Sequence, residues 1–502
     1  MIELSNQSAR PHIDVKLVLG ILGSFVFFLG FALMIPAGVA VVYNETTWQA
    51  FLLSAAIALL LGSGLYWVFR PQYEVRIREG FLIVSLTWLF LSLVGALPFV
   101  LSGILENYTD AVFETMSGLT TTGATILGGT TASGQEIPIV EDLPKSLLFW
   151  RSLAHWLGGM GIIVLSIAIL PFLGVGGFQL YKAEVPSPMP DKLKPRIRDT
   201  ATVLWKVYVL FSLLELLLLM AGGMGFYDAI CHALTTMPTG GFSTQNLSIA
   251  GFDSLYFDIV FIGFMFVAGV NFALHYQMLM GRPLAYWRDP ECRFFLFSVL
   301  ILIGVVCISI FGSVYESIGD ALRYGTFQVV SILTTTGYAT ADYNQWPAVS
   351  KLILLLCMFL GGSAGSTGGG MKMMRIMCCF KFCYKELFNL VHPHAVSYVK
   401  IGGKTVSDAV IGSILGFLGL YMGLFGLCSV LLAGMGVDFV TSFSAVAASI
   451  GNIGPGLALV GPVDNYADIP YMGKWLLSWC MLLGRLEIYT VIIFLVPEFW
   501  RK

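Results

Sequence analysis

Ten apolar stretches constrain what this chain can fold into more than any other feature of its 502 residues. Each approaches the length of about 20 residues that a helix needs to cross a bilayer. They begin near Leu17, Phe51, Phe81, Ser146, Val207, Phe257, Phe294, Leu352, Val410 and Trp475. Only 12% of the residues are charged, whereas soluble domains carry about 25%. The chain is therefore predicted to be an all-α polytopic membrane protein.

The first stretch, from Leu17 to Tyr43, is too long for the apolar region of a cleavable signal peptide, which has about 7–15 residues. We interpret it as a permanent spanning helix. Together with the second stretch it forms a two-helix unit over residues 1–79.

Basic residues gather in one set of loops between the stretches, while the other set is acidic. The basic loops hold Arg70, Arg76, Arg78, Lys182, Lys192, Lys194, Arg196, Arg198, Arg282, Arg288, Arg293, Lys381, Lys385, Lys400, Lys404, Arg501 and Lys502. Cytoplasmic loops are enriched in Lys and Arg, so both termini are predicted to be cytoplasmic. The net charge of -2 argues against a nucleic-acid partner, which would need a basic patch.

Four segments on the acidic side share one pattern, a short apolar run followed by a glycine loop. We call them glycine loops 1 to 4; they cover residues 120–124, 237–241, 334–338 and 451–455, with central glycines predicted at Gly123, Gly240, Gly337 and Gly454. Each lies between two apolar stretches. The pattern predicts four tandem repeats of span, short helix, loop and span, over residues 80–200, 201–290, 291–405 and 406–502, in a pseudo-fourfold arrangement.

Each short run has an aspartate near its start, namely Asp110, Asp228, Asp320 and Asp438. One interpretation is helix N-capping, for which aspartate is a preferred residue. The other is an external vestibule that concentrates cations. The sequence leaves both open.

Irregular backbone at membrane depth is tolerated only within protein or along a water-filled cavity. Four such loops can surround one axis, and a ring of their carbonyl groups can replace the hydration shell of a potassium ion. The C-terminal ends of the short helices would add partial negative charge. The predicted ion-binding residues are Thr121, Thr122, Gly123, Pro238, Thr239, Gly240, Thr335, Thr336, Gly337, Asn452, Ile453 and Gly454. Pro238 and Ile453 each remove a hydroxyl ligand, so the predicted filter is chemically asymmetric.

A glycine-rich segment, residues 361–370, interrupts the eighth apolar stretch. Glycine is unfavourable in a helix, so we expect a break there. A phosphate loop would need Gly-Lys-Ser/Thr, which the Met371-Lys372 sequence lacks. A flexible break inward of the loops could gate the path, although close packing of small residues is the alternative. The predicted gate residues are Gly362, Gly365, Ser366, Thr367, Gly368, Gly369, Gly370, Lys372 and Arg485.

Arg485 lies within the tenth stretch, and an intramembrane charge is a functional hypothesis by default. A structural ion pair with nearby Glu487 is the alternative. Arg151 in the fourth stretch also needs an acidic partner, which the sequence does not identify.

The four glycine loops, the segment from Gly362 to Lys372 and the sequence Gly484-Arg485-Leu486-Glu487 resemble those of the Trk/Ktr/HKT potassium transporters. The resemblance covers nearly the whole chain, and the extra N-terminal pair of spans favours the bacterial TrkH branch. It implies potassium as the transported ion, with Arg485 facing the pore below the filter and holding the glycine-rich segment. It also implies a lipid-embedded homodimer in the bacterial inner membrane, on a cytosolic, nucleotide-binding TrkA-like ring.

Three classes of function remain to be weighed. A gated, channel-like potassium pore is the first. A symporter coupled to protons or sodium is the second. Such carriers use intramembrane titratable groups and often have inverted repeats. Here the repeats run in parallel, and the spans contain few carboxylates apart from Glu215 and Glu487. An enzyme is disfavoured because no nucleophile–base set, paired carboxylates or metal-ligand cluster stands out, and no resident cofactor is expected.

Overall fold

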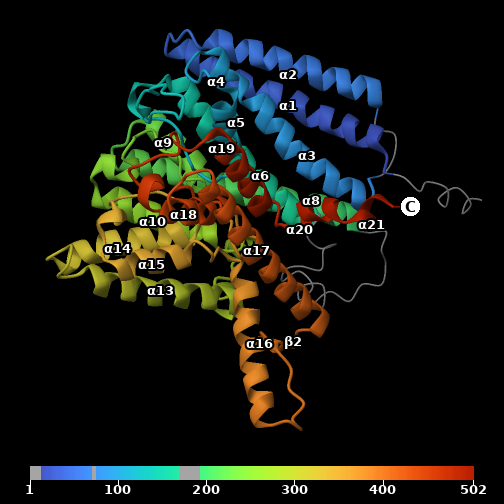
Figure 1. Ribbon diagram of the computed structural model, residues 1–502, viewed down its shortest axis with the longest axis vertical. Helices are drawn as coiled ribbons and strands as arrows, with labels where there is room; N and C mark the ends of the chain where they lie inside the picture. The colour runs from blue at the N-terminus through green and yellow to red at the C-terminus, as the bar shows by residue number, and fades with distance from the viewer. Residues whose placement is uncertain (1–12, 71–74, 169–192, 502) are drawn as a thin grey trace, which may run out of the picture.

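The computed structural model describes residues 13–70, 75–168 and 193–501, and its regular structure is almost entirely helical (Figure 1). Lys182, Lys192 and Lys502 of the basic loops lie outside these residues. Within the described ranges, six helices are long and apolar enough to cross a membrane. They are α1 (Val15–Val42), α2 (Trp48–Phe69), α3 (Ile77–Gly95) with its continuation α4 (Leu97–Leu101), α8 (Leu193–Ala221), α13 (Pro290–Ile310) and α17 (Asp408–Gly434). The chain is a polytopic helical membrane protein.

Other spans are bent or interrupted. Two helix pairs bend by 105° and 110° at short breaks: α10 (Leu255–Gly269) with α11 (Phe272–Leu279), and α19 (Tyr471–Arg485) with α20 (Tyr489–Ile492) and the short 3-10 helix η7 (Ile493–Leu495). The eighth stretch divides into α15 (Ala348–Cys357) and α16 (Met373–Val391), and the fourth is α6 (Lys145–Ala168). The break predicted between α15 and α16 is confirmed. The sequence did not predict the other two.

Tertiary contacts explain the bend between α10 and α11. The Gly269 carbonyl accepts a hydrogen bond from Ser363 N at 2.8 Å, and Phe272 N donates to the Gly365 carbonyl at 3.1 Å. Asn271 caps α11 through its side chain, which accepts from Ala273 N. The glycine-rich segment from another part of the chain therefore satisfies backbone groups that a continuous helix would have used.

Four short helices lie between the longer ones: α5 (Tyr108–Leu119), α9 (Phe226–Thr236), α14 (Ile318–Leu333) and α18 (Phe439–Ile450). Each precedes a glycine loop. The remaining elements are η1 (Val140–Asp142), η4 (Ser248–Phe252), α12 (Ala285–Arg288), η5 (Tyr343–Gln345), β1 (Lys400–Ile401), β2 (Lys404–Thr405), η6 (Ala458–Val460) and α21 (Pro497–Trp500). β1 and β2 pair as an antiparallel hairpin.

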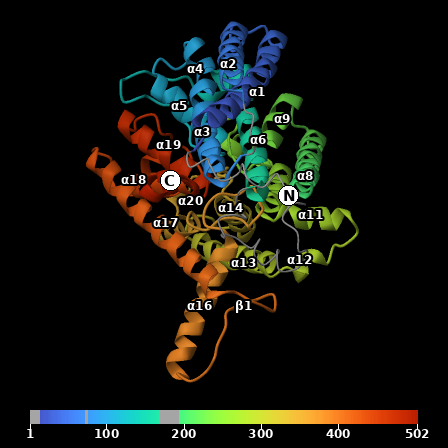
Figure 2. The same cartoon turned by 90° about the vertical axis from the view of Figure 1, so that its right-hand side faces the viewer.

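Two parts of the chain extend from the central body. α1 and α2 pack against each other along one side, next to α3, where a Cβ at Gly62 would overlap the Phe27 backbone (Figure 1). Small residues let membrane helices approach this closely. α16 and the β1–β2 hairpin project from the other end (Figure 2). The short helices and glycine loops are enclosed between these extremities.

Candidate ion-conduction site

All four short helices end in the same turn. In each turn a backbone N–H donates a hydrogen bond to the carbonyl five residues earlier. The four bonds are Thr122 to Ser117 (2.9 Å), Gly240 to Thr235 (2.8 Å), Thr336 to Ser331 (2.9 Å) and Ile453 to Ala448 (2.8 Å). Each turn places a non-glycine residue at positive φ, namely Thr121 (51°), Thr239 (58°), Thr335 (61°) and Asn452 (54°). Such residues cost about 1–3 kcal/mol each and cluster at functional sites. Four equivalent cases therefore point to one shared site.

The turns align the four loops and correct one prediction. Glycines follow at φ 80° (Gly123), 80° (Gly241), 85° (Gly337) and 97° (Gly454). In loop 2 the equivalent of the other central glycines is thus Gly241, while Gly240 occupies the position of Thr122, Thr336 and Ile453. The predicted alignment of loop 2 is off by one residue, because two adjacent glycines made both alignments possible.

The loops contact one another in cyclic order around one axis. A Cβ added at each central glycine would collide with a carbonyl oxygen of the next loop: Gly123 with Gly240, Gly241 with Thr336, Gly337 with Ile453 and Gly454 with Thr122 (2.7 Å). The four carbonyls all belong to the residue before a central glycine. Glycine is required here for both its positive φ and its lack of a side chain.

A small cavity of about 70 Å³ lies against the outer side of this ring. Gly123, Gly241, Gly337 and Gly454 all line it, together with the side chains of Arg151 and Asp464. All four loops therefore share one opening.

The corrected alignment makes a prediction about two neighbouring glycines. Gly241→Ala should lower potassium flux more than Gly240→Ala, because Gly241 alone has positive φ and its methyl group would collide with the backbone carbonyl of Thr336, whereas a methyl group at Gly240 would collide with the side chain of His155. We expect at least about a tenfold difference, since a strained positive-φ residue costs about 1–3 kcal/mol. Flux of the two purified variants in liposomes measures it. Equal losses in both would contradict the alignment.

The aspartates near the short helices do not share one role. Asp438 caps α18, accepting from Val440 N and Thr441 N. In α5 the cap is Asn107 instead, and buried Asp110 pairs with Lys474 at 2.5 Å. Asp228 accepts from the Thr244 hydroxyl at 2.7 Å. The capping interpretation is thus correct for Asp438, and α14 is capped by Ser317 rather than Asp320.

The glycine-rich segment lies directly against the inner ends of the loops. Gly369 N donates to the Thr335 hydroxyl at 2.7 Å. The Thr367 hydroxyl donates to the Met237 carbonyl at 2.9 Å. A Cβ at Gly369 would collide with the Gly451 carbonyl. The segment therefore contacts loops 2, 3 and 4 at once.

The side chains predicted for the gate converge on this segment. Arg485 is buried and donates to the carbonyls of Thr367 at 2.7 Å and Gly158 at 3.3 Å. Lys372 donates to the Gly368 carbonyl, and the Ser366 hydroxyl donates to Ser363. Gly362, Gly365 and Gly370 meet backbone or side-chain atoms where a Cβ would be. Thus the segment is tied to α6 and α19 through one arginine.

The alternative ion pair between Arg485 and Glu487 is wrong. Glu487 pairs with Arg375 at the start of α16. Within the described residues, no carboxylate forms a salt bridge with Arg485. Arg151, whose partner was unknown, binds Glu114 of α5 at 2.8 Å.

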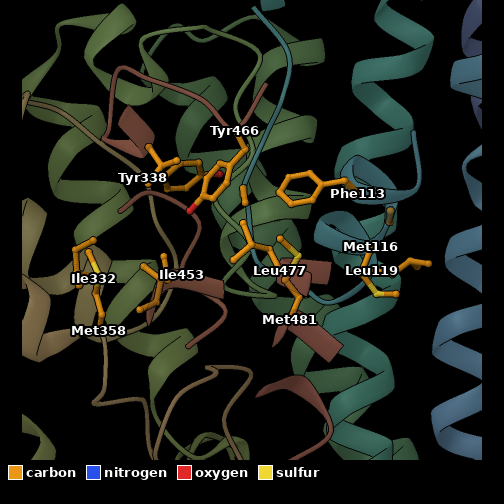
Figure 3. Close-up of a cluster of buried hydrophobic side chains, with 14 of the residues drawn as sticks. Phe113, Met116, Leu119, Ile332, Tyr338, Met358, Ile453, Tyr466, Leu477 and Met481 are labelled. Carbon is orange, nitrogen blue, oxygen red and sulfur yellow. The ribbon is translucent and has the colours of Figure 1, made fainter. Parts of the chain in front are cut away.

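Two buried tyrosines that the sequence did not single out support the loops (Figure 3). The Tyr338 hydroxyl lies 2.5 Å from the Thr235 hydroxyl of α9. The Tyr466 hydroxyl donates to the Gly454 carbonyl at 2.6 Å, and its ring contacts Phe113 of α5. The position of Tyr338 directly after a central glycine was the only feature of the sequence that could have pointed to its role. No feature of the sequence pointed to Tyr466.

Comparison with known proteins decides the family. The model of the TrkH cation transport proteins matches residues 47–502. The chain belongs to the TrkH family. A Trk system potassium uptake protein TrkH from Salmonella typhimurium is 42% identical over 488 residues, which cover 96% of this chain and 98% of that protein. The TrkG protein of Escherichia coli, another Trk system potassium uptake protein, is 37% identical over 97% of this chain and 99% of its own length.

The TrkH-family fold is also found in a solved structure. The crystal structure of the potassium transporter TrkH from Vibrio parahaemolyticus matches with a TM-score of 0.88 and 37% identity. It covers 97% of this chain and 100% of that one. The helical membrane-transporter fold of this TrkH-family chain is therefore shared over nearly its full length.

Proposed function

We propose that this chain takes up potassium through a selectivity filter built from the four glycine loops. The cyclic contacts between Gly123, Gly241, Gly337 and Gly454 and the preceding carbonyls carry the proposal. They support four tandem repeats, each of two spans with a short helix and loop between them, in pseudo-fourfold arrangement behind the α1–α2 pair. A carbonyl ring of this kind replaces potassium's hydration shell.

The ligands differ from repeat to repeat. Thr121, Thr122, Thr335 and Thr336 each carry a hydroxyl in addition to the backbone carbonyl, whereas Ile453 and Gly240 have only the carbonyl to offer. Asn452 uses its amide to bind the Thr122 hydroxyl at 3.0 Å and the Met481 carbonyl at 2.9 Å. Thr239 and Pro238 lie in the turn that ends α9. The filter is therefore pseudo-symmetric in backbone and asymmetric in chemistry.

The gate lies in the glycine-rich segment and consists of the residues predicted for it, namely Gly362, Gly365, Ser366, Thr367, Gly368, Gly369, Gly370, Lys372 and Arg485. In the described conformation the segment lies across the inner ends of three loops, and Arg485 holds it through the Thr367 carbonyl. A buried cation in this place also repels potassium. Conduction then requires the segment to move and the arginine to release it.

The chain acts in the bacterial inner membrane, surrounded by lipid, with both termini in the cytoplasm. It forms a homodimer, supported by an apolar stripe on the projecting α16 that includes Phe380, Tyr384, Leu387 and Val391, each at least 64% exposed. Exposed patches of this kind mark interaction sites. A nucleotide-binding, TrkA-like ring binds its cytoplasmic face and regulates the gate.

A symporter coupled to protons or sodium is the second candidate. Glu215 favours it, because this carboxyl is fully buried within α8 close to the turn of loop 2. Buried carboxyl groups in spans often relay protons.

Ion flux into liposomes that contain the purified full-length chain distinguishes the candidates. We expect potassium flux down its own gradient, larger than sodium flux, with no imposed pH or sodium gradient. The Glu215→Gln variant should then keep this flux. Potassium movement that requires a proton or sodium gradient and is lost in Glu215→Gln would overturn the channel-like pore in favour of the symporter.

A further inference from the structure

Each short helix has one polar side chain that is hydrogen-bonded to a residue just beyond its glycine loop, at the backbone in repeats 1, 3 and 4 and at a side chain in repeat 2. Glu114 accepts from Ile126 N at 3.0 Å, and His232 binds the Ser243 hydroxyl at 3.0 Å. With its amide oxygen facing the backbone, Gln328 accepts from Thr340 N at 2.8 Å. Ser444 accepts from Leu457 N at 2.9 Å. Each of the four loops is thus supported by a side chain of its own short helix, at positions that differ by at most one residue between repeats.

The braces differ in charge. His232 must donate from Nδ1 to the Asp228 carbonyl, and the complete burial of the ring favours its neutral form, in which Nε2 accepts from the Ser243 hydroxyl. Gln328 and Ser444 are neutral as well. Among these four braces, only Glu114 is joined to a cation, because Arg151 Nε donates to it at 2.8 Å. Repeat 1 therefore has a buried ion pair where the other repeats have neutral hydrogen bonds.

Arg151 extends this brace from loop 1 to loop 2. Its Nη2 donates to the Thr125 hydroxyl at 3.2 Å, and that hydroxyl also donates to Glu114 at 3.0 Å. The guanidinium carbon lies 3.9 Å from the ring centroid of Phe242, the residue after Gly241. One turn further along α6, the His155 ring stacks on Phe242 at 4.2 Å. Through Arg151 and His155, α6 thus contacts the residues just beyond both loop 1 and loop 2.

The burial of this pair argues for a geometric role. The side chains of Arg151 and Glu114 are 3% and 0% exposed. A buried ion pair contributes little net stability compared with apolar residues of similar volume, because both charges lose their hydration. It does impose strict geometry, since a carboxylate and a guanidinium bind through directional, charge-assisted hydrogen bonds.

We propose that Glu114 and Arg151 are positioning residues of the filter, which hold loops 1 and 2 together so that their carbonyls select potassium over sodium. The inference rests on the function proposed above. Discrimination between the two ions depends on the arrangement and field of the carbonyl groups. Loosening the brace should therefore admit sodium while the protein still folds and conducts.

The test is the potassium-to-sodium permeability ratio of a double variant, Glu114→Gln with Arg151→Met, in liposomes. This variant leaves no unpaired buried charge, and methionine replaces the aliphatic part of arginine. We expect the ratio to fall about tenfold, because hydrogen bonds to charged groups are the strong ones. An unchanged ratio in a folded variant overturns the proposal.

A second buried ion pair provides a matched control. Lys474 and Asp110 lie 2.5 Å apart with side chains 0% and 1% exposed, and Asp110 belongs to the same helix as Glu114. Among the described residues, neither side chain is hydrogen-bonded to a glycine loop. Asp110→Asn with Lys474→Met should keep the wild-type ratio. An equal fall in this control would mean that any buried pair on α5 matters, and would overturn the specific assignment.

Arg151→Lys keeps the charge and tests the proposal even when the double variant does not fold. A lysine cannot bind Glu114 and Thr125 and also lie on Phe242 as a planar group. We expect a ratio between those of the wild type and the double variant, and a wild-type ratio would overturn the proposal. A wild-type protein that does not distinguish the ions would overturn the proposed function itself, and this inference with it. A selective wild type with an unaffected double variant overturns this inference alone.

Discussion

Gly123→Ser is expected to lower the potassium-to-sodium permeability ratio by more than about tenfold, since positive φ alone costs a non-glycine residue about 1–3 kcal/mol. Gly123 has φ 80°, and a Cβ there would collide with the Gly240 carbonyl of the next loop. A serine side chain at position 123 and the Gly240 carbonyl cannot both occupy these positions. The ring must widen or tilt, and either change weakens its preference for potassium. Flux of both ions in liposomes measures the ratio.

Gly103→Ser is the matched control for this variant. Gly103 lies in the same repeat at φ 76°, and a Cβ there meets no atom within 4 Å. It imposes the same backbone strain without touching the carbonyl ring. We expect a small loss of stability and a wild-type ion ratio. If Gly123→Ser also keeps the wild-type ratio, loop 1 does not form part of the filter.

Arg485→Met is expected to raise potassium flux about tenfold. A unit positive charge roughly 10 Å from a potassium ion raises its energy by about 1.7 kcal/mol at an effective dielectric constant of about 20. Arg485 is 2% exposed and binds only carbonyl groups among the described residues, so no carboxylate there neutralises it. Its removal also frees the Thr367 carbonyl, and with it the glycine-rich segment. Initial rates of potassium flux in liposomes measure the change.

Arg293→Met removes a positive charge from an exposed position near the start of α13. It should leave the flux unchanged, which separates the effect of Arg485 from a general change in charge. A folded Arg485→Met variant with wild-type flux would show that this arginine neither blocks the path nor holds the gate.

The helices and glycine loops of the proposed repeats could be predicted because their pattern is local. A short apolar run, a glycine loop and a long apolar stretch on each side are visible in consecutive residues, and the bilayer restricts such stretches to helices. The break between α15 and α16 was predictable for the same reason, since many glycines in one segment disfavour a helix. The bend at residues 270–271 was not, because its backbone groups are satisfied by Ser363 and Gly365.

The alignment of loop 2 shows where local pattern stops being sufficient. Gly240 and Gly241 are chemically identical, and only the folded backbone shows that Gly241 is the central glycine, through its φ of 80° and its contact with the Thr336 carbonyl. Similarly, Glu487 is the carboxylate nearest to Arg485 along the chain, yet it binds Arg375. Sequence distance was the wrong guide because α19 ends at Arg485 and Glu487 lies within the break at which the chain bends by 110°.

The sequence by itself determined a helical membrane protein with four glycine loops, a glycine-rich break and two arginines, Arg151 and Arg485, within apolar stretches. These features follow from composition and local propensity, which consecutive residues are enough to show. Only the tertiary structure decided the cyclic order of the loops, the partners of Arg151 and Arg485, and the central glycine of loop 2. Those features depend on contacts between residues far apart in the chain, such as Gly454 with Thr122. No pattern within one segment encodes them.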